Sequence, residues 1–429
     1  MVAVAIGYEI FQRTHSATAL GLMGLAGALP VILLSLPAGQ VADRFRRKRI
    51  LIVTQLILVA SSAALVALSL NYSVVPDLPA LAWINRGIAS LAALFGEKTG
   101  VSFQPALPLF YGLLLLNGVA RAFGWSARSP FVANLVPRTA LASAVTWGST
   151  NFEVGSVVGP AIGGLVIAQF GFSIVYALDA ICGLVFIGFL LPIADHQERI
   201  EPGLIRRHPL RELFAGLGFV FRKKVILASI TLDLFAVLLG GATALLPMLA
   251  DQVLHVGAVG LGWLRAAPSF GALAMALTIA HRPPMRRPGV TLLWAVGAFG
   301  LATVLFGLSR SFWFSLSMLA LTGALDNISV VVRHTLVQLL TPDSMRGRVS
   351  AVNNIFIGSS NELGALESGL TAALFGPALA IVAGGMGTIV VVLGAAWCWP
   401  ELRRIGALHL ITQEPEDRQA DATAGGVPP

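Results

Sequence analysis

At the junction of two long apolar segments, 17–41 and 49–70, the chain carries the polar stretch Gly39-Gln-Val-Ala-Asp43-Arg44-Phe-Arg46-Arg47-Lys48-Arg49. Each apolar segment reaches the roughly 20 residues that a helix needs to cross a bilayer. Only helices and closed barrels satisfy their backbone groups in lipid, and apolar runs this long and continuous are typical of helices. The polar stretch is therefore expected at a membrane surface, between two membrane-spanning helices.

The rest of the chain repeats this pattern. Of its 429 residues, 56% are hydrophobic and 12% are charged, whereas a soluble domain has about 25% charged residues. We expect an all-α polytopic membrane protein with about twelve transmembrane helices, at 1–12, 17–41, 49–70, 105–129, 139–168, 171–193, 223–251, 257–281, 287–309, 311–339, 346–374 and 376–398. The first is too short to span a bilayer, so we expect it to be truncated. The long connection at 71–105 is predicted to hold either a surface helix or a loop insertion.

The basic residues indicate how the chain is oriented. Most of the 29 Lys and Arg fall in every second loop and in the C-terminal tail. This asymmetry is the positive-inside pattern, in which the basic loops are cytoplasmic. It predicts a multi-pass protein of the inner (plasma) membrane with both termini in the cytoplasm, and it explains the net charge of +8 without a nucleic-acid partner.

The chain also contains an internal repeat. Ser143-Ala144-Val145 and Glu153 in the first half correspond to Ser350-Ala351-Val352 and Glu362 in the second. Duplicated six-helix halves are a known transporter design, with the substrate site between them. We expect an N-terminal half, a polar and basic cytoplasmic linker, a C-terminal half and a disordered cytoplasmic tail, at 1–193, 194–222, 223–400 and 401–429.

The stretch at 39–49 resembles the loop signature of the major facilitator superfamily, G-x-x-x-D-R-x-G-R-[RK]. The matching residues are Gly39, Asp43, Arg44, Arg47 and Lys48; Arg46 stands where the superfamily commonly has glycine. The resemblance implies a conformational latch that closes the cytoplasmic side. The alternative is that the basic residues only fix the topology.

A second motif lies in the segment 139–168. It reads Gly155-Ser-Val-Val-Gly159-Pro160-Ala-Ile-Gly163-Gly164 and resembles the superfamily's antiporter motif, found mostly in exporters. Glycines four residues apart also let helices pack backbone to backbone, so simple packing is the alternative to efflux.

Further stretches resemble the branch of the superfamily that includes the enterobactin exporters and secretion effectors. They are Arg121-Ala-Phe, Leu232-Asp233-Leu-Phe-Ala, Gly262-Trp-Leu-Arg265-Ala-Ala-Pro268, Thr335-Leu-Val-Gln338 and Met345-Arg-Gly-Arg348-Val-Ser-Ala. The resemblance covers nearly the whole chain and implies a small-molecule substrate that is siderophore-like or drug-like.

Ionisable residues inside membrane helices are expensive and are functional candidates by default. The candidates for coupling or substrate binding are Asp233, Glu153, Glu362, Arg121, Asp326, Arg333, Glu367 and Arg265. Asp326 and Arg333 are two helical turns apart on one face, and structural ion pairing with neighbours is the alternative to a functional role for them. Asp233 has no cation within its own helix, and it is a candidate for proton coupling, with a structural hydrogen-bonded role as the alternative. Glu9 and Asp179 are expected near an interface.

Other chemistries lack their motifs. The sequence has no G-x-x-x-x-G-K-[ST] stretch for ATP, no H-E-x-x-H and no Cys-x-x-Cys, so we expect neither an enzyme nor a cofactor or metal site. The predicted function is secondary active transport by alternating access, by a monomeric exporter that binds a small solute and protons within the lipid bilayer. The alternatives are an importer or uniporter and a non-transporting membrane sensor.

Overall fold

The computed structural model describes residues 1–72, 75, 79–95, 105–137, 140–193, 209–282, 285 and 287–404, and its regular elements there are all helices. The first half comprises α1 (Val2–Thr14), α2 (Ala17–Arg44), α3 (Arg47–Leu70), α4 (Pro79–Leu94), α5 (Leu107–Leu135), α6 (Leu141–Phe170) and α7 (Phe172–Leu190). The helix α8 (Pro209–Arg222) connects to the second half, which comprises α9 (Lys224–Leu239), the 3-10 turn η3 (Ala242–Leu245), α10 (Leu246–Gln252), α11 (Gly257–Ala280), α12 (Pro288–Leu308), α13 (Phe312–Leu340), α14 (Asp343–Phe375), α15 (Pro377–Cys398) and α16 (Pro400–Arg404).

Ten stretches of the described residues are long and apolar enough to cross a membrane. Two of the twelve expected spans are not among them: α1, with 13 residues, and α14, which carries Glu362 and Glu367 along its 33 residues. The expected helix at 223–251 is broken, because α9 ends at Leu239 and the chain continues through η3 into α10. Two consecutive glycines, Gly240 and Gly241, have low helix propensity and explain the break.

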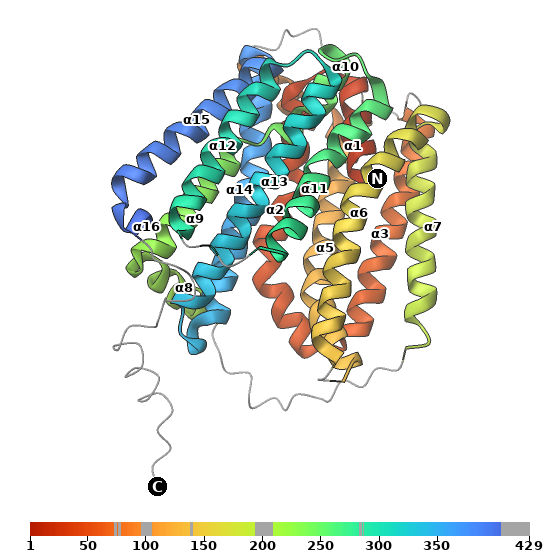
Figure 1. Ribbon diagram of the computed structural model, residues 1–429. Coiled ribbons are helices and arrows are strands. Elements are labelled where there is room, and N and C mark those ends of the chain that lie inside the picture. Colours follow the sequence, from red (N-terminus) through yellow and green to blue (C-terminus); the bar gives the residue numbers. More distant parts are fainter. Residues whose placement is uncertain are drawn as a thin grey trace.

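The two halves use the same helix pairings. In the first half α2 and α3 each pack against α5, and α3 packs against α7; in the second, α11 and α12 each pack against α13, and α12 packs against α15. In Figure 1 the first half (red to yellow) lies mainly on the right and the second (green to blue) on the left. Between the halves, α2 packs against α14 and α6 packs against α11.

Two pairs of turns repeat in the same way. Gly171 joins α6 to α7 with φ 80°, and Gly376 joins α14 to α15 with φ 83°. A side chain at either position would be strained, because L-residues rarely adopt this backbone conformation. His15 and His255 have φ 48° and 50° and stand before α2 and before α11, the corresponding helices of the two halves.

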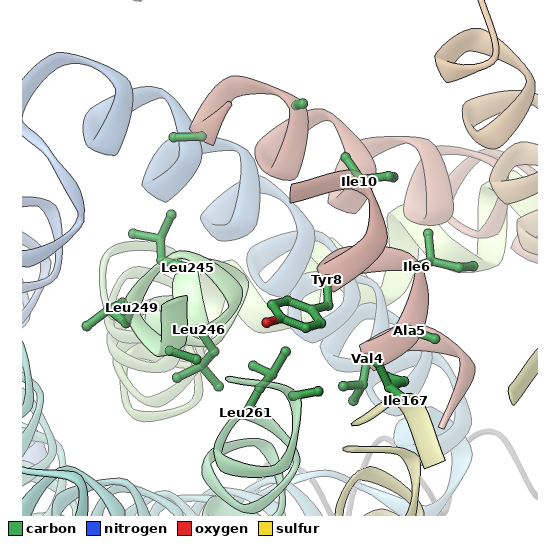
Figure 2. Close-up of a cluster of buried hydrophobic side chains, with 14 of the residues drawn as sticks. Val4, Ala5, Ile6, Tyr8, Ile10, Ile167, Leu245, Leu246, Leu249 and Leu261 are labelled. Atoms are coloured by element: carbon green, nitrogen blue, oxygen red, sulfur yellow. The ribbon is translucent and has the colours of Figure 1, made fainter. Parts of the chain in front are cut away.

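At one end of the bundle, called here the closed end, the halves are in close contact. Tyr8 of α1 points toward Leu246 of α10 and Leu261 of α11, and Val4 lies beside Ile167 of α6 (Figure 2). All five side chains are buried. This apolar cluster joins α1 and α6 of the first half to α10 and α11 of the second.

Glycines bring the backbones of the two halves together near this end. A Cβ added to Gly369 of α14 would lie 2.6 Å from the Cα of Gly21 in α2, and one added to Gly164 of α6 would lie 2.9 Å from the Cα of Gly262 in α11. These are backbone contacts that no larger residue could make without a shift.

Toward the opposite end, called here the open end, the helices of the two halves diverge (Figure 1). A Cβ added to Gly39 of α2, or to Gly148 or Gly155 of α6, would meet nothing within 4 Å. Among the described residues, none therefore approaches Gly39 closely in this conformation.

Outside the spans, three short helices lie where the sequence left alternatives or predicted none. α4 occupies part of the connection at 71–105, so this segment contains a helix, packed on α5 and α2. α8 lies within the segment expected as a polar linker. The expected disordered tail begins as α16, in which Leu402 is fully buried; residues 405–429 lie outside the described part of the chain.

Candidate functional site

Three of the candidate charged residues come together where the two halves meet. Glu362 lies on α14, and its Oε2 would be 3.6 Å from a Cβ added to Gly24 of α2 in the other half. The guanidinium groups of Arg121, on α5, and Arg265, on α11, both act electrostatically on the Glu362 carboxylate. We call Arg121, Arg265 and Glu362 the central cluster.

Each arginine of the central cluster is oriented by a further contact. Arg265 donates a hydrogen bond of 2.7 Å to the carbonyl oxygen of Thr243, in the 3-10 turn that interrupts the α9–α10 span. The guanidinium carbon of Arg121 lies 5.4 Å from the centre of the Trp125 ring. With two cations and one carboxylate, the cluster has a net positive charge when all three groups are ionised. It can bind a polar or anionic group of a solute at the interface of the two halves.

A second group of charges lies within the second half. Asp233 of α9 forms an ion pair with Arg333 of α13, and the two side chains are 6% and 2% exposed. Asp326 makes no ion pair with the described residues, and Arg333 takes its partner from another helix. Asp233 therefore has a cationic partner. Because this partner lies on another helix, the sequence around Asp233 could not reveal it.

Asp326 nevertheless lies close to this ion pair. Asp233 and Asp326 both line a cavity of about 10 Å³ between α9, α12 and α13, together with Ser329 and Phe299. A cavity of this size has room for about one water molecule. Two carboxylates, one guanidinium and space for water make this a place where a proton can be held.

The other two candidate carboxylates do not join either group. The hydroxyl of Thr371 donates a hydrogen bond of 2.9 Å to Glu367, one turn away on the same helix. Glu153, on α6, is partly exposed and makes no hydrogen bond or ion pair with the described residues. The internal repeat relates Glu153 to Glu362 in sequence, but only Glu362 lies in the central cluster.

The glycine motif of α6 contains two different environments. Gly164 packs on α11, and a Cβ added to Gly262 of α11 would lie 2.6 Å from the carbonyl oxygen of Pro160. Gly155, at the start of the motif, has open space around it. Gly159 and Gly163 lie against Met1, at 3.4 and 3.1 Å from an added Cβ. The motif thus packs α6 on the second half near the closed end.

The stretch at 39–49 lies at the open end, and its basic residues bond within the first half. Lys48 donates to the carbonyl oxygens of Leu191 and Ile193, at 2.7 and 2.6 Å, just beyond the end of α7. Arg47 donates to the carbonyl oxygen of Pro130 in α5 at 3.4 Å. The side chain of Asp43 lies outside the described part of the structure. These bonds tie α3 to α5 and α7.

A buried network around Glu9 was not predicted. Glu9 is fully buried and pairs with Arg13, and it accepts hydrogen bonds of 2.6 Å from Tyr176 and 2.7 Å from Ser69. Arg13 also lies 3.7 Å over the ring of Tyr72, just beyond α3, and burial raises the pKa of that tyrosine. The i, i+4 spacing of Glu9 and Arg13 was the available signal.

Comparisons with known proteins agree with this architecture. The sequence model of the Major Facilitator Superfamily matches residues 1–365, and the chain belongs to that family. It is therefore a multi-pass membrane transporter and not an enzyme.

Among its relatives are enterobactin exporters. The chain is 28% identical over 406 residues to Enterobactin exporter EntS of Escherichia coli O1:K1 / APEC, covering 94% of this chain and 89% of the relative. It is 27% identical over 405 residues to Enterobactin exporter EntS of Shigella boydii serotype 18, with the same shares covered.

Solved structures share the fold at low sequence identity. A bacterial homolog of the human lysosomal transporter Spinster, inward-facing and unoccupied, has a TM-score of 0.66 and 15% identity, covering 94% of this chain and 93% of that one. The xylose transporter XylE from E. coli, in an inward open conformation, has a TM-score of 0.64 and 12% identity, covering 92% and 91%.

Proposed function

We propose that this transporter exports a small amphipathic solute, siderophore-like or drug-like, across the inner membrane in exchange for protons. The observation that carries the proposal is the central cluster, in which Arg121 from one half acts on Glu362 from the other. A solute bound there touches both halves, so its release can follow a change in their relative position. The enterobactin exporters among the relatives support efflux and the substrate class.

Alternating access needs one end closed and the other open, and the contacts between the halves have this distribution. The apolar cluster and the glycine contacts hold the closed end together, while Gly39 and Gly155 have no close neighbours. The basic residues of 39–49 lie at the open end, which we assign to the cytoplasm by the positive-inside rule. In this proposal the C-terminal tail is cytoplasmic and the structure represents an inward-facing conformation.

The latch residues Gly39, Asp43, Arg44, Arg47 and Lys48 are proposed to act in the opposite conformation. In this structure Arg47 and Lys48 donate hydrogen bonds to carbonyl oxygens of their own half. Closing the cytoplasmic end would bring this loop toward the second half, where new ion pairs could form. The proposed halves are 1–193 and 223–400, joined by 194–222, in a monomer with the tail 401–429 in the cytoplasm.

We place proton coupling at the pair of Asp233 and Arg333, with Asp326 beside it. Protonation of Asp233 would remove the charge that compensates the buried guanidinium, and Asp326 is the nearest carboxylate along the shared cavity that could replace it. A buried arginine without a counter-ion is costly, so binding and release of a proton would change how α9 packs on α13.

Proton movement in sealed, inside-out vesicles tests this function. The vesicles carry an imposed pH gradient, acidic inside, and receive a panel of siderophores and dyes. At least one compound is expected to discharge the gradient with the wild-type protein. Arg121→Gln should raise the KM for that compound about tenfold or more, the effect of losing a charged hydrogen bond, whereas Arg86→Gln, on the surface helix α4, should not.

Two results would count against the proposal. If a compound is transported but the gradient stays intact, the proton coupling is wrong. If no compound is moved by the wild type, or if it moves only into the cytoplasmic compartment, export is wrong.

A further inference from the structure

The helix α8 has one face packed on the protein. Gly216 and Val220 are buried, and a Cβ added to Gly216 would lie 2.8 Å from the carbonyl oxygen of Arg348 in α14. This backbone contact fixes the rotation of α8 about its own axis. It therefore determines which side chains of α8 face outward.

The outward face carries two large aromatic side chains. Phe214 is 66% exposed and Phe221 is 59% exposed. They are seven residues apart, so they lie on the same side of the helix after two turns. Arg222 is exposed and lies roughly 100° further round the helix than Phe221. An apolar strip with a cation at its edge is the pattern of helices that lie in a membrane interface.

The position of α8 in the chain places this face at the bilayer surface. Lys223 alone separates α8 from α9, which begins a candidate membrane span at Lys224. The Lys224 side chain is 69% exposed and adds a second cation near Arg222, although it also pairs with Glu401. If these two phenylalanines faced water, a large apolar area would stay hydrated, at a free-energy cost of about 25 cal/mol for each Å².

We propose that α8 is an interfacial helix that inserts Phe214 and Phe221 among the acyl chains and binds anionic phospholipid headgroups through Arg222 and Lys224. The phosphate and the acyl chain of one lipid match the cation and the apolar strip. Because the opposite face is packed on α14, this lipid contact is made by a helix attached to the same element that carries Glu362. The inference does not depend on which solute is transported.

Spin-label accessibility tests this proposal without a transport assay. In full-length protein with Cys182 and Cys398 replaced by Ser, a nitroxide is attached at Phe214→Cys and, separately, at Arg310→Cys, an exposed residue between α12 and α13. The proteins are placed in phosphatidylcholine vesicles with or without about 30% phosphatidylglycerol. Collisions with oxygen report the acyl region, and collisions with a nickel chelate report water.

With phosphatidylglycerol, we expect the oxygen-to-nickel ratio at position 214 to exceed that at position 310 severalfold. When phosphatidylglycerol is left out, or when Arg222→Gln is added, nickel accessibility at position 214 should rise about fivefold. This factor is the contribution of one basic residue to binding at an anionic surface. Arg310→Gln is the matched charge control and should change nothing at 214. A label at 214 as accessible to nickel as the one at 310 overturns the interfacial position. Equal values in both kinds of vesicle overturn the headgroup assignment.

Discussion

The buried pair of Asp233 and Arg333 permits a quantitative test of how the second half is held together. Replacing either partner alone leaves the other charge in a site where the side chains are 6% and 2% exposed. Breaking a buried ion pair in this way costs about 3–5 kcal/mol, whereas replacing both charges is often neutral. We therefore expect Asp233→Asn and Arg333→Gln each to destabilise the protein by about that amount, and the double variant to unfold close to the wild type.

The measurement is a double-mutant cycle, with unfolding in mixed micelles of a mild detergent and dodecyl sulfate followed by circular dichroism. Because the coupling energy is the double-variant cost minus the two single-variant costs, its expected magnitude is about 6–10 kcal/mol. Asp326→Asn is the control, because it removes a carboxylate from the same cavity without removing the partner of Arg333. Strictly additive effects of the two single variants would show that the charges do not compensate each other, and the proposed coupling site would then lose its basis.

Three further predictions use matched positions along the chain. Gly164→Ala introduces a methyl group against α11 and should open the closed end at a cost of about 1–3 kcal/mol. The opening would be measured as a longer distance between spin labels at Phe170→Cys and His255→Cys. Gly155→Ala, in open space, should leave this distance unchanged, and equal effects of the two variants would contradict the packing argument. Gly216→Ala should lower the thermal stability of the protein, because its methyl group meets the backbone of α14. Gly218→Ala is the control: a Cβ at this position would have nothing within 4 Å, so the variant should be slightly more stable through its higher helix propensity. A Gly216→Ala variant more stable than the Gly218→Ala variant would refute the contact. Lys48→Met removes both bonds to the end of α7 and should destabilise by about 1 kcal/mol in the same micelle assay, and Arg49→Met, exposed at the neighbouring position, should have no comparable effect.

The spans could be predicted because each long apolar segment carries its own signal. In a bilayer every backbone group must be bonded within the segment, so length and hydropathy alone decide that it is a helix. This is why α3, α12 and α15 begin and end within a few residues of the predicted bounds. The interruption after Leu239 was missed, although Gly240 and Gly241 are a recognisable helix-breaking pair.

The partners of the charged residues could not be predicted in the same way. Asp326 and Arg333 share one face of α13, but the sequence does not identify the neighbours with which they could pair. The observed partner of Arg333 is Asp233, one hundred positions earlier in the chain, and only the packing of α9 on α13 brings the two together. Spacing along one helix identifies neighbours within that helix, whereas a buried charge is satisfied by whichever carboxylate the tertiary structure places nearest.

The turns at corresponding places in the two halves extend the internal repeat, which sequence comparison of the halves detected only in part. Gly171 and Gly376 are separated by 205 positions, close to the 209 positions that separate Glu153 from Glu362. A positive φ at the same junction of both halves indicates that the two bundles share a backbone geometry even where their side chains differ. The sequence signal was present, since a glycine directly precedes an apolar span in each case.

The distribution of bonds within and between the halves bears on how the molecule could move. Ion pairs and hydrogen bonds tie helices inside each half: Glu9 to Tyr176, Lys48 to the end of α7, and Asp233 to Arg333. The closed end is instead joined by apolar side chains and by backbone contacts at Gly21 and Gly164, which involve no buried charge that must find a new partner on separation. Electrostatic interaction between the halves is found at the central cluster, where a solute would bind. This arrangement favours motion of one half against the other around the binding site, because each half is held together internally and the closed end is joined by apolar contacts. A bound solute could replace part of the electrostatic contact at the central cluster that this motion changes.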